Sequence, residues 1–488
     1  MSAPIDRRLF LRQSGAAALG LAALLTPEQV FAATAPADWR LGVADVEADV
    51  APRAMRLVSG KAPAGLRGCL LRNGPAKFRR GTGAAGHWFD GDGLVRRFAI
   101  DGGEVRLSAR FVDTPKRRAE RAAGAILAPG FGTRAAPGFA MTSADDANAA
   151  NTSLLMSGGE LLALWEAGSP VRMDPETLAT RGLKTFRPDL AHMPFLAHPR
   201  IEPDGRVWNL GLSGRNSILW QLAPGGALAG ADMIELPRAS YIHDFTATAR
   251  HIVIVLQPWI HEGASATVID SLKWKPELGT QILVIDKADF GRRRLYELPA
   301  FAFFHLGDAW EEKDGTIRFD GCIEANPTFG ATAAVALIAG RFAPAPLPIL
   351  GMIALHPDGR ATLAPTGAIA EFPRSDPRFA GVERRYSLHT GLYGRDRPMA
   401  RGIALFDWKT GRDTSYDFGA NHLVEEFLFT PRGAAEGDGW ILGTSVNLAE
   451  QATELHILDA RNLAAGPVAT WRADVALPVG FHGIYVAG

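Results

Sequence analysis

Residues 200–208 read RIEPDGRVW, with the turn triplet Pro-Asp-Gly between two short stretches that can form strands. Proline fixes φ at the start of a tight turn, and aspartate and glycine accept the backbone angles that reverse the chain, so the stretch predicts a β-hairpin. Residues 355–361, LHPDGRA, contain the same Pro-Asp-Gly turn. Lys-Asp-Gly at 313–315 and Lys-Thr-Gly at 409–411 mark two more turns. Hairpin patterns therefore recur along the chain.

The segments between such turns are short and apolar. Examples are residues 252–256, 281–285 and 454–458. Strands at this density, without the alternating helices of a parallel α/β sheet, indicate an all-β fold: a sandwich, a barrel or a propeller.

Length and composition agree with one large domain. The chain has 488 residues, of which 47% are hydrophobic, so it can bury a large core, and a propeller can use this length as a single domain. Its 53 glycines and 32 prolines are scattered, and no low-complexity linker divides the chain. We expect one domain over residues 33–488.

Charge and cysteine content exclude several classes of protein. The formal net charge is zero and the pI is near 7.2, so nothing indicates a surface for nucleic acid. Cys69 and Cys322 are too few for a disulfide framework or a thiolate metal cluster. A single bridge between them is one alternative, but we expect two unpaired, buried cysteines, because free cysteine packs as a small hydrophobic residue.

The first residues of the chain predict that the protein is exported from the cytoplasm. Residues 7–12, RRLFLR, resemble a twin-arginine signal, residues 14–25 form a weakly hydrophobic core, and Val30-Phe31-Ala32 is a cleavage site. We expect residues 1–32 to be a signal peptide and the mature protein to be periplasmic. The alternative, an amphipathic N-terminal helix, fits the paired arginines and the uncharged run less well. No later segment reaches the ~20 apolar residues that span a bilayer.

Four of the twelve histidines sit at the mouths of apolar, strand-like stretches: His198, His243, His305 and His482. They are 45, 62 and 177 residues apart, which excludes a single helix face or one hairpin. Imidazole is the commonest metal-binding side chain, and the inner strands of a propeller line one central axis, so the pattern favours a metal site in a propeller. The alternative for each histidine is a hydrogen-bonded packing residue.

Ordered motifs run along almost the whole mature chain. They are LRNGP at 71–75, HWFDGDG at 87–93, NT at 151–152, LLALWE at 161–166, AHP around His198, HDF around His243, FH around His305, EFPR at 371–374 and GFHG at 480–483. In kind and order they resemble the carotenoid cleavage oxygenases, a family that includes lignostilbene dioxygenases and apocarotenoid oxygenases. The resemblance selects the same four histidines as the metal ligands and catalytic centre.

The resemblance implies a seven-bladed propeller in which loops and short helices cap an axial Fe(II) site. It implies that Glu166, Glu371 and Glu426 hold the second ring nitrogens of metal-bound histidines, the role that carboxylates commonly play beside such ligands. Glu425 adjoins Glu426, so the third glutamate could be either of these two residues. Four histidines also leave two places of an octahedron for dioxygen or substrate, which suits Fe(II) better than closed tetrahedral zinc.

The activity implied is insertion of dioxygen across one conjugated C=C bond of an apolar small molecule, giving two carbonyl fragments without an organic cofactor. The chain has no Gly-x-Gly-x-x-Gly after a strand, no Walker-type loop and no Gly-x-Ser-x-Gly elbow, so competing enzyme classes lack support. A non-catalytic, ligand-binding propeller is the alternative from a different class.

Substrate choice depends on two loops. Stilbene and phenylpropenoid cleavers of the family use an aromatic residue and a lysine to orient the substrate phenol. Residues 111–118, FVDTPKRR, have basic residues where the aromatic is expected, and residues 145–151, DDANAAN, contain no lysine. We therefore favour a carotenoid or apocarotenoid, with a stilbene or phenylpropenoid as the alternative.

A carotenoid is held in lipid, and the resemblance implies an apolar patch that dips into a membrane beside the entrance. Candidates are residues 342–350, which include the run APAPLPIL, and residues 126–131. Such a patch would bind peripherally. Burial of Leu347, Ile349 and Leu350 in the core is the alternative.

Overall fold

The computed structural model describes residues 38–394 and 397–488. The predicted signal peptide, residues 1–32, lies outside the described residues. The chain divides into two units, Met1–Asp38 and Trp39–Gly488, and the fold described below is that of the second unit.

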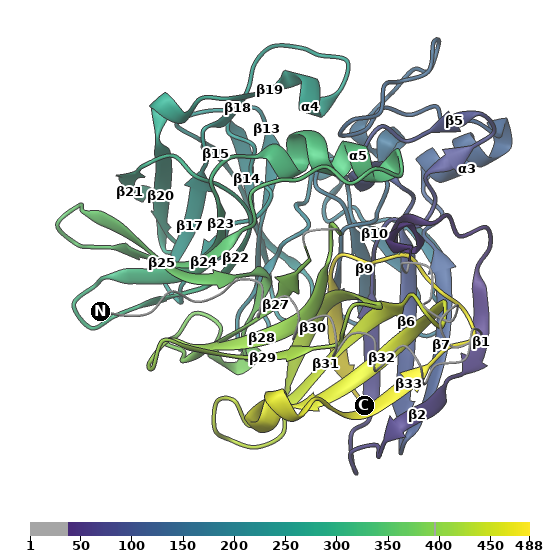
Figure 1. The fold of residues 1–488 in the computed structure, drawn as a ribbon. Helices are drawn as coiled ribbons and strands as arrows, with labels where there is room; N and C mark the ends of the chain where they lie inside the picture. Colours follow the sequence, from purple (N-terminus) through teal and green to yellow (C-terminus); the bar gives the residue numbers. More distant parts are fainter. Residues whose placement is uncertain (1–37, 395–396) are drawn as a thin grey trace, which may run out of the picture. The chain divides into compact units, whose positions relative to one another are not determined.

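Strands dominate this unit, and its large sheets are seven antiparallel blades among the residues described (Figure 1). Blade 1 contains, from the inside outward, β34 (Gly483–Ala487), β3 (Gly68–Arg72), β6 (Leu94–Asp101), β7 (Glu104–Phe111) and β1 (Val50–Ala54). Blade 2 contains β8 (Ser153–Ser157), β9 (Glu160–Leu164), β10 (Val171–Met173) and β11 (Thr180–Leu183). Blade 3 contains β12 (Arg200–Ile201), β13 (Val207–Ser213), β14 (Asn216–Leu222) and β15 (Leu228–Glu235).

The remaining four blades follow in chain order. Blade 4 contains β16 (Thr246–Ala247), β17 (His251–Leu256), β20 (Thr280–Asp286) and β21 (Asp289–Leu298). Blade 5 contains β22 (Ala302–Glu311), β23 (Ile317–Glu324), β24 (Ile349–Leu355) and β25 (Ala361–Ile369). Blade 6 contains β26 (Glu371–Arg374), β27 (Tyr386–Tyr393), β28 (Ala400–Asp407) and β29 (Arg412–Asp417). Blade 7 contains β30 (His422–Pro431), β31 (Gly439–Asn447), β32 (Ala452–Asp459), β33 (Pro467–Arg472) and β2 (Arg56–Gly60).

The predicted turns lie between paired strands. In the first, Arg200 of β12 is opposite Trp208 of β13. In the second, Leu355 of β24 is opposite Ala361 of β25. Gly205 and Gly359 have φ of 87° and 90°, the left-handed region that favours glycine in a tight turn. The all-β, seven-bladed fold is therefore confirmed.

Both ends of the described chain close the ring. The C-terminal β34 pairs with β3 to form the innermost strand of blade 1, with Gly483 opposite Arg72. Near the N-terminus, β2 pairs with β33 as the outermost strand of blade 7. Each of these blades thus combines strands from opposite ends of the sequence, which ties the ring together.

The core lies between the blades. Each of the seven junctions between neighbouring blades holds a cluster of buried apolar side chains in the described part of the chain. Blade strands are consequently buried on both faces, and β17 is an example, with every residue from Ile252 to Leu256 buried. This explains why its sequence is a continuous apolar run rather than an alternating one.

Loops and short helices form the expected cap. Figure 1 places the helices α3 (Pro115–Ala123), α4 (Val268–Ser271) and α5 (Ala334–Ile338) in the upper part of the view, together with the pair β18 (Trp259–His261) and β19 (Leu272–Trp274) and the pair β4 (Arg79–Arg80) and β5 (Gly83–Ala84). Thr114 caps the N-terminus of α3, its side chain accepting from the Arg117 amide, and Gly124, with φ of 62°, caps the C-terminus.

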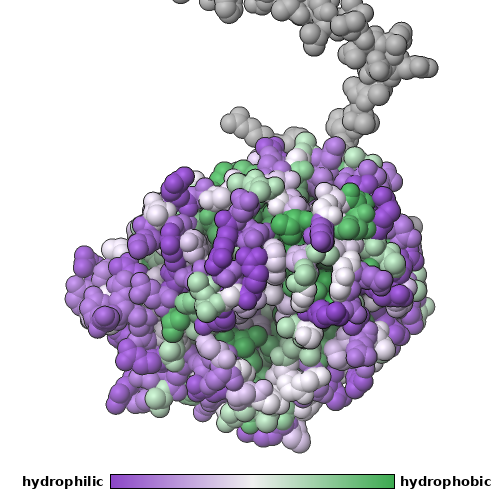
Figure 2. Space-filling model, turned by 90° about the horizontal axis from the view of Figure 1, so that it is seen from below, coloured by the Kyte–Doolittle hydropathy of each residue, from purple (hydrophilic) through white to green (hydrophobic). Residues whose placement is uncertain are grey.

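Two smaller expectations concern cysteine and the membrane. Cys69 and Cys322 are both free, Cys322 buried and Cys69 only partly so. None of the helices in the described residues has the length and apolar character needed to cross a bilayer. Figure 2 shows the face that points downward in Figure 1, where hydrophilic residues predominate toward the edges and apolar residues show in a hollow near the middle.

Candidate metal centre

The four histidines come from four different blades, each at or just before an innermost strand. His198 precedes β12, His243 precedes β16, His305 lies within β22, and His482 is followed directly by β34. Because the innermost strands surround the axis, the ends of these strands carry side chains that are distant in sequence to one place. The structure thus brings together all four histidines selected from the sequence.

Their ring nitrogens converge. The Nε2 atoms of His198 and His243 are 3.0 Å apart, and those of His305 and His482 are 3.2 Å apart. One ligand atom from each of the four histidines lies within 4.8 Å of the others. Nitrogens about 2.1 Å from one ion lie about 3 Å apart when adjacent and about 4.2 Å apart when opposite. The observed spacing fits a single metal ion.

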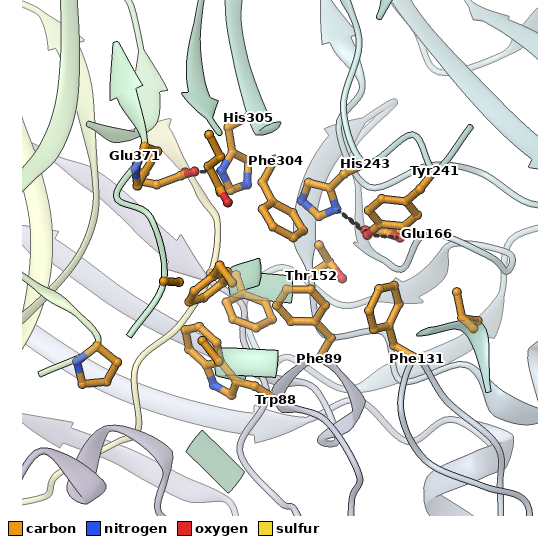
Figure 3. Close-up of a pocket in the computed structure, with 18 of the residues that line it drawn as sticks. Trp88, Phe89, Phe131, Thr152, Glu166, Tyr241, His243, Phe304, His305 and Glu371 are labelled. Carbon is orange, nitrogen blue, oxygen red and sulfur yellow. Dashed lines mark hydrogen bonds and ion pairs between the residues drawn. The ribbon is translucent and has the colours of Figure 1, made fainter. Parts of the chain in front are cut away.

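Three carboxylates face the outer ring nitrogens of three of these histidines. Nδ1 of His243 donates to Glu166, and Nδ1 of His305 donates to Glu371 (Figure 3). Nδ1 of His482 donates to Oε1 of Glu426 at 2.9 Å. A donor bond at Nδ1 fixes the tautomer that leaves Nε2 free to bind a metal.

A β-bulge explains the two adjacent glutamates of β30. Its register with β31 shifts between Val424 and Phe427, where three steps on β30 face two on β31. The extra residue disturbs the alternation of side chains, and both Glu425 and Glu426 are buried. Glu426 contacts His482, whereas Glu425 accepts hydrogen bonds from Arg72, at 3.2 Å from Nη2, and from Thr444 at 2.8 Å.

Glu371 is held by an unusual backbone. The next residue, Phe372, has φ of 54°, a left-handed conformation that is rare for an aromatic residue. Its ring stacks on His305 with 4.7 Å between centroids. Its amide donates to Oε2 of Glu371 at 2.8 Å. These contacts fix both the carboxylate and the imidazole that it orients.

The charges around the site suit a divalent cation. Burial and the three other histidines lower the pKa of His198 well below its usual value, and burial lowers the pKa of His482 to about 3. Burial raises the pKa of Glu426, but Arg374 and His482 together hold it below its usual range. Neutral imidazoles and an ionised carboxylate are the protonation states in which a metal binds.

His198 differs from the other three histidines. Among the described residues no carboxylate bonds to its ring, and its Nε2 atom lies 3.0 Å from Nε2 of His243. Its ring packs against the other imidazoles, with centroids 4.6 Å from His243 and 4.5 Å from His482.

A cavity of about 1100 Å³ adjoins the histidines and is bounded by residues of both the blades and the cap. Most of its wall is apolar, and the aromatic residues lining it include Trp88, Phe89, Phe131, Tyr241, Phe304, Phe329 and Phe481. Figure 3 shows Phe89, Phe131 and Phe304 gathered near His243 and His305. Such a cavity can hold an elongated apolar molecule and exclude water from the site.

Sequence analysis did not single out this aromatic wall. Some of its members adjoin the metal-site residues in sequence, since Phe304 precedes His305, Phe481 precedes His482 and Tyr241 lies two residues before His243. Neighbours of ligands at a strand end were therefore the available signal. Phe131 comes from a loop and Phe329 from the first residue of a short helical segment, Phe329–Ala333, and no periodic pattern marks either of them.

Comparisons with known proteins show the family of the chain. The family model for RPE65, retinal pigment epithelial membrane protein, matches residues 43–487. An apocarotenoid-15,15'-oxygenase from Synechocystis is 30% identical, covering 92% of this chain and 94% of its own. Resveratrol cleavage oxygenase 1 from Aspergillus fumigatus is also 30% identical, over 82% of this chain and 86% of its own.

A solved structure of the cobalt-substituted Synechocystis apocarotenoid oxygenase superposes with a TM-score of 0.85 at 28% identity, covering 93% of this chain and 99% of that one. The fold is thus that of the Synechocystis apocarotenoid oxygenase. The chain belongs to the RPE65/carotenoid oxygenase family.

Proposed function

We propose that this protein is a non-haem Fe(II) dioxygenase that cleaves one conjugated C=C bond of a carotenoid or apocarotenoid. The observation that carries the proposal is the convergence of His198, His243, His305 and His482 beside a large apolar cavity. One dioxygen supplies both oxygen atoms, and the broken double bond becomes two carbonyl groups, so the reaction balances without another reductant.

The donor set fits iron. Four neutral imidazoles satisfy a borderline metal and leave places open, as oxygen chemistry at Fe(II) requires. The bound metal would supply the binding and activation of dioxygen. The Synechocystis apocarotenoid oxygenase has been solved in a cobalt-substituted form, which supports a divalent-metal site in that protein.

The chain's own residues orient three of the four histidines and shield the site from water. Glu166, Glu371 and Glu426 fix the imidazoles of their histidines, and the Tyr241 hydroxyl donates to Glu166 at 3.2 Å. The aromatic wall packs against a conjugated chain and keeps water away from the reacting bond.

The alternative substrates are stilbenes and phenylpropenoids. A relative named resveratrol cleavage oxygenase supports this alternative. The basic residues that stand where an aromatic residue is expected include Lys116 of α3, which does not border the cavity. Lys116 is buried and bonds to Asp92 at 2.9 Å and Glu120 at 3.0 Å. This engagement favours the carotenoid or apocarotenoid.

Purified, iron-loaded protein incubated with an apocarotenal and, separately, with a hydroxystilbene tests the proposal. We expect loss of the apocarotenal and formation of two carbonyl fragments, identified by mass spectrometry. Cleavage of the hydroxystilbene alone would establish the alternative substrate. A protein with its full iron that binds both compounds and cleaves neither would be a ligand-binding propeller.

The proposal includes peripheral contact with a membrane through residues 342–350. Residues 342–348 border the cavity, and Leu347 is 42% exposed. The second candidate, residues 126–131, is less suitable because Phe131 is buried inside the cavity wall. Export by a twin-arginine signal would place the protein in the periplasm.

A further inference from the structure

Within the part of the chain that the structure describes, one carboxyl group in the cavity wall has no partner. Glu324, the last residue of β23, borders the cavity and is 2% exposed. Its Oε2 atom is shut off from solvent, and nothing in the described residues donates a hydrogen bond to this carboxyl group or pairs with it. Buried polar groups in native proteins almost always have a partner, so an exception at a cavity calls for an explanation.

Glu324 is not one of the carboxylates that orient the histidines. Glu166, Glu371 and Glu426 each bond to an imidazole, whereas Glu324 does not. The pairing of β22 with β23 sets Glu324 opposite Ala302, three residues before His305. Glu324 and His305 therefore come from neighbouring strands, and both border the cavity, but Glu324 does not bond to the histidine site.

The surroundings favour the acid form of this group. Burial and the nearby charge of Glu371 raise the pKa of Glu324 well above its usual value. Burial and Glu371 also raise the pKa of Tyr393, which borders the same cavity. A carboxylic acid that keeps its proton at neutral pH is a hydrogen-bond donor as well as an acceptor.

We propose that Glu324 selects the oxygen-bearing form of the substrate, its acid O–H donating a hydrogen bond to a carbonyl or hydroxyl oxygen carried by the conjugated chain. The inference rests on the proposed function for the identity of the chain. A hydrocarbon of the same length leaves the buried acid unpaired, and a site with an unpaired polar group discriminates against such a ligand. The substrate class is thereby narrowed to oxygenated polyenes.

Binding without turnover tests this assignment. Iron-loaded protein kept free of dioxygen is titrated with an apocarotenal and with the matching hydrocarbon, and binding is followed by quenching of tryptophan fluorescence, because Trp88 and Trp165 border the cavity. We expect wild-type protein to bind the aldehyde about tenfold more tightly, as one net hydrogen bond allows.

Two variants and a control sharpen the result. Glu324→Leu should abolish the preference by weakening only aldehyde binding, and Glu324→Gln, which keeps an N–H donor, should retain most of it. Glu297→Leu makes the same substitution on β21 at an exposed position that does not border the cavity, and it should change neither affinity. Melting temperature and iron content establish that each variant is folded.

Equal affinity of wild-type protein for the two ligands would overturn the assignment, and so would an equal loss of both affinities in Glu324→Leu. If the leucine variant does not fold, the wild-type comparison and Glu324→Gln decide. A preference for the aldehyde without cleavage in the aerobic assay refutes the proposed function alone. Cleavage of both compounds without a preference refutes the role of Glu324 alone.

Discussion

Glu425 and Glu426 are identical side chains with different surroundings. Glu426 bonds to His482 and accepts from the Gly483 amide at 2.8 Å. Glu425 lies among Arg72, Arg96 and Thr444. Both carboxylates pair with arginines, since Glu426 also accepts from Arg72 at 2.9 Å and from Arg374 at 2.7 Å, but of the two only Glu426 bonds to a histidine.

The single bond to His482 predicts that two matched variants differ in iron affinity. Glu426→Gln should weaken iron binding ~10–100-fold, the usual cost of losing a partner that orients a metal ligand. Glu425→Gln should leave iron affinity nearly unchanged and lower the melting temperature, because buried arginines lose their counter-charge. Iron titration and thermal melting of both variants measure this, and the reverse pattern would contradict the assignment.

For individual residues, the sequence predicted the site best where the residue stands in a family motif. His198 and Glu371 were identified because each stands in a short, ordered motif. Glu324 was not, because a glutamate in a sequence gives no sign that its carboxyl group will face a cavity without a partner. That property depends on β22, Glu371 and the cap, which are distant along the chain.

Among the elements, hairpins were predictable and irregularities were not. Pro-Asp-Gly turns have local causes, so β12–β13 and β24–β25 could be located from the sequence. The bulge in β30 depends on packing against neighbouring strands, and no turn residue marks it. The register of Glu425 and Glu426 was therefore open until the structure was known.

Residues 342–350 combine two environments. Leu347 is 42% exposed beside the cavity, whereas Leu350 is fully buried within β24. Ile349 is half-buried and paired with Ile323 and Ile369. The proposed membrane contact and the alternative of core packing thus apply to different residues of one segment.

Single substitutions separate these environments. Leu347→Ser should weaken binding to liposomes and slow the cleavage of a membrane-held carotenoid, with stability changed by less than about 0.5 kcal/mol. Leu350→Ser, the matched core variant, should cost about 3 kcal/mol of stability. Liposome sedimentation and thermal melting test both. Unchanged liposome binding by Leu347→Ser would place the membrane contact elsewhere.

In the whole molecule, the ring of seven blades brings the four histidines of the site together. The all-β class followed from turn spacing, but the number of blades did not, because blades differ in length and the ring is closed by β2 and β34 from opposite ends of the chain. The seven apolar junctions hold the ring rigid, so four distant histidines keep one geometry.

Acid should destabilise the ring through a histidine away from the site. Burial lowers the pKa of His456 to about 3 in the folded protein. The unfolded chain takes up this proton near pH 6.5, so stability should fall as pH decreases from about 6.5 to about 3, by on the order of a few kcal/mol. His456→Gln should melt with a weaker dependence on pH over this range, while His356→Gln should behave as wild type. Identical pH profiles for all three proteins would contradict this.

The central claim is that four histidines of four blades hold one Fe(II), and elemental analysis of purified protein tests it most directly. We predict about one iron per wild-type chain, a strong loss of iron and of activity when His198, His243, His305 or His482 is replaced by alanine, and full iron in the control His356→Ala. A full iron complement in any of the four alanine variants would remove that histidine from the site. Full iron in all four would contradict the account.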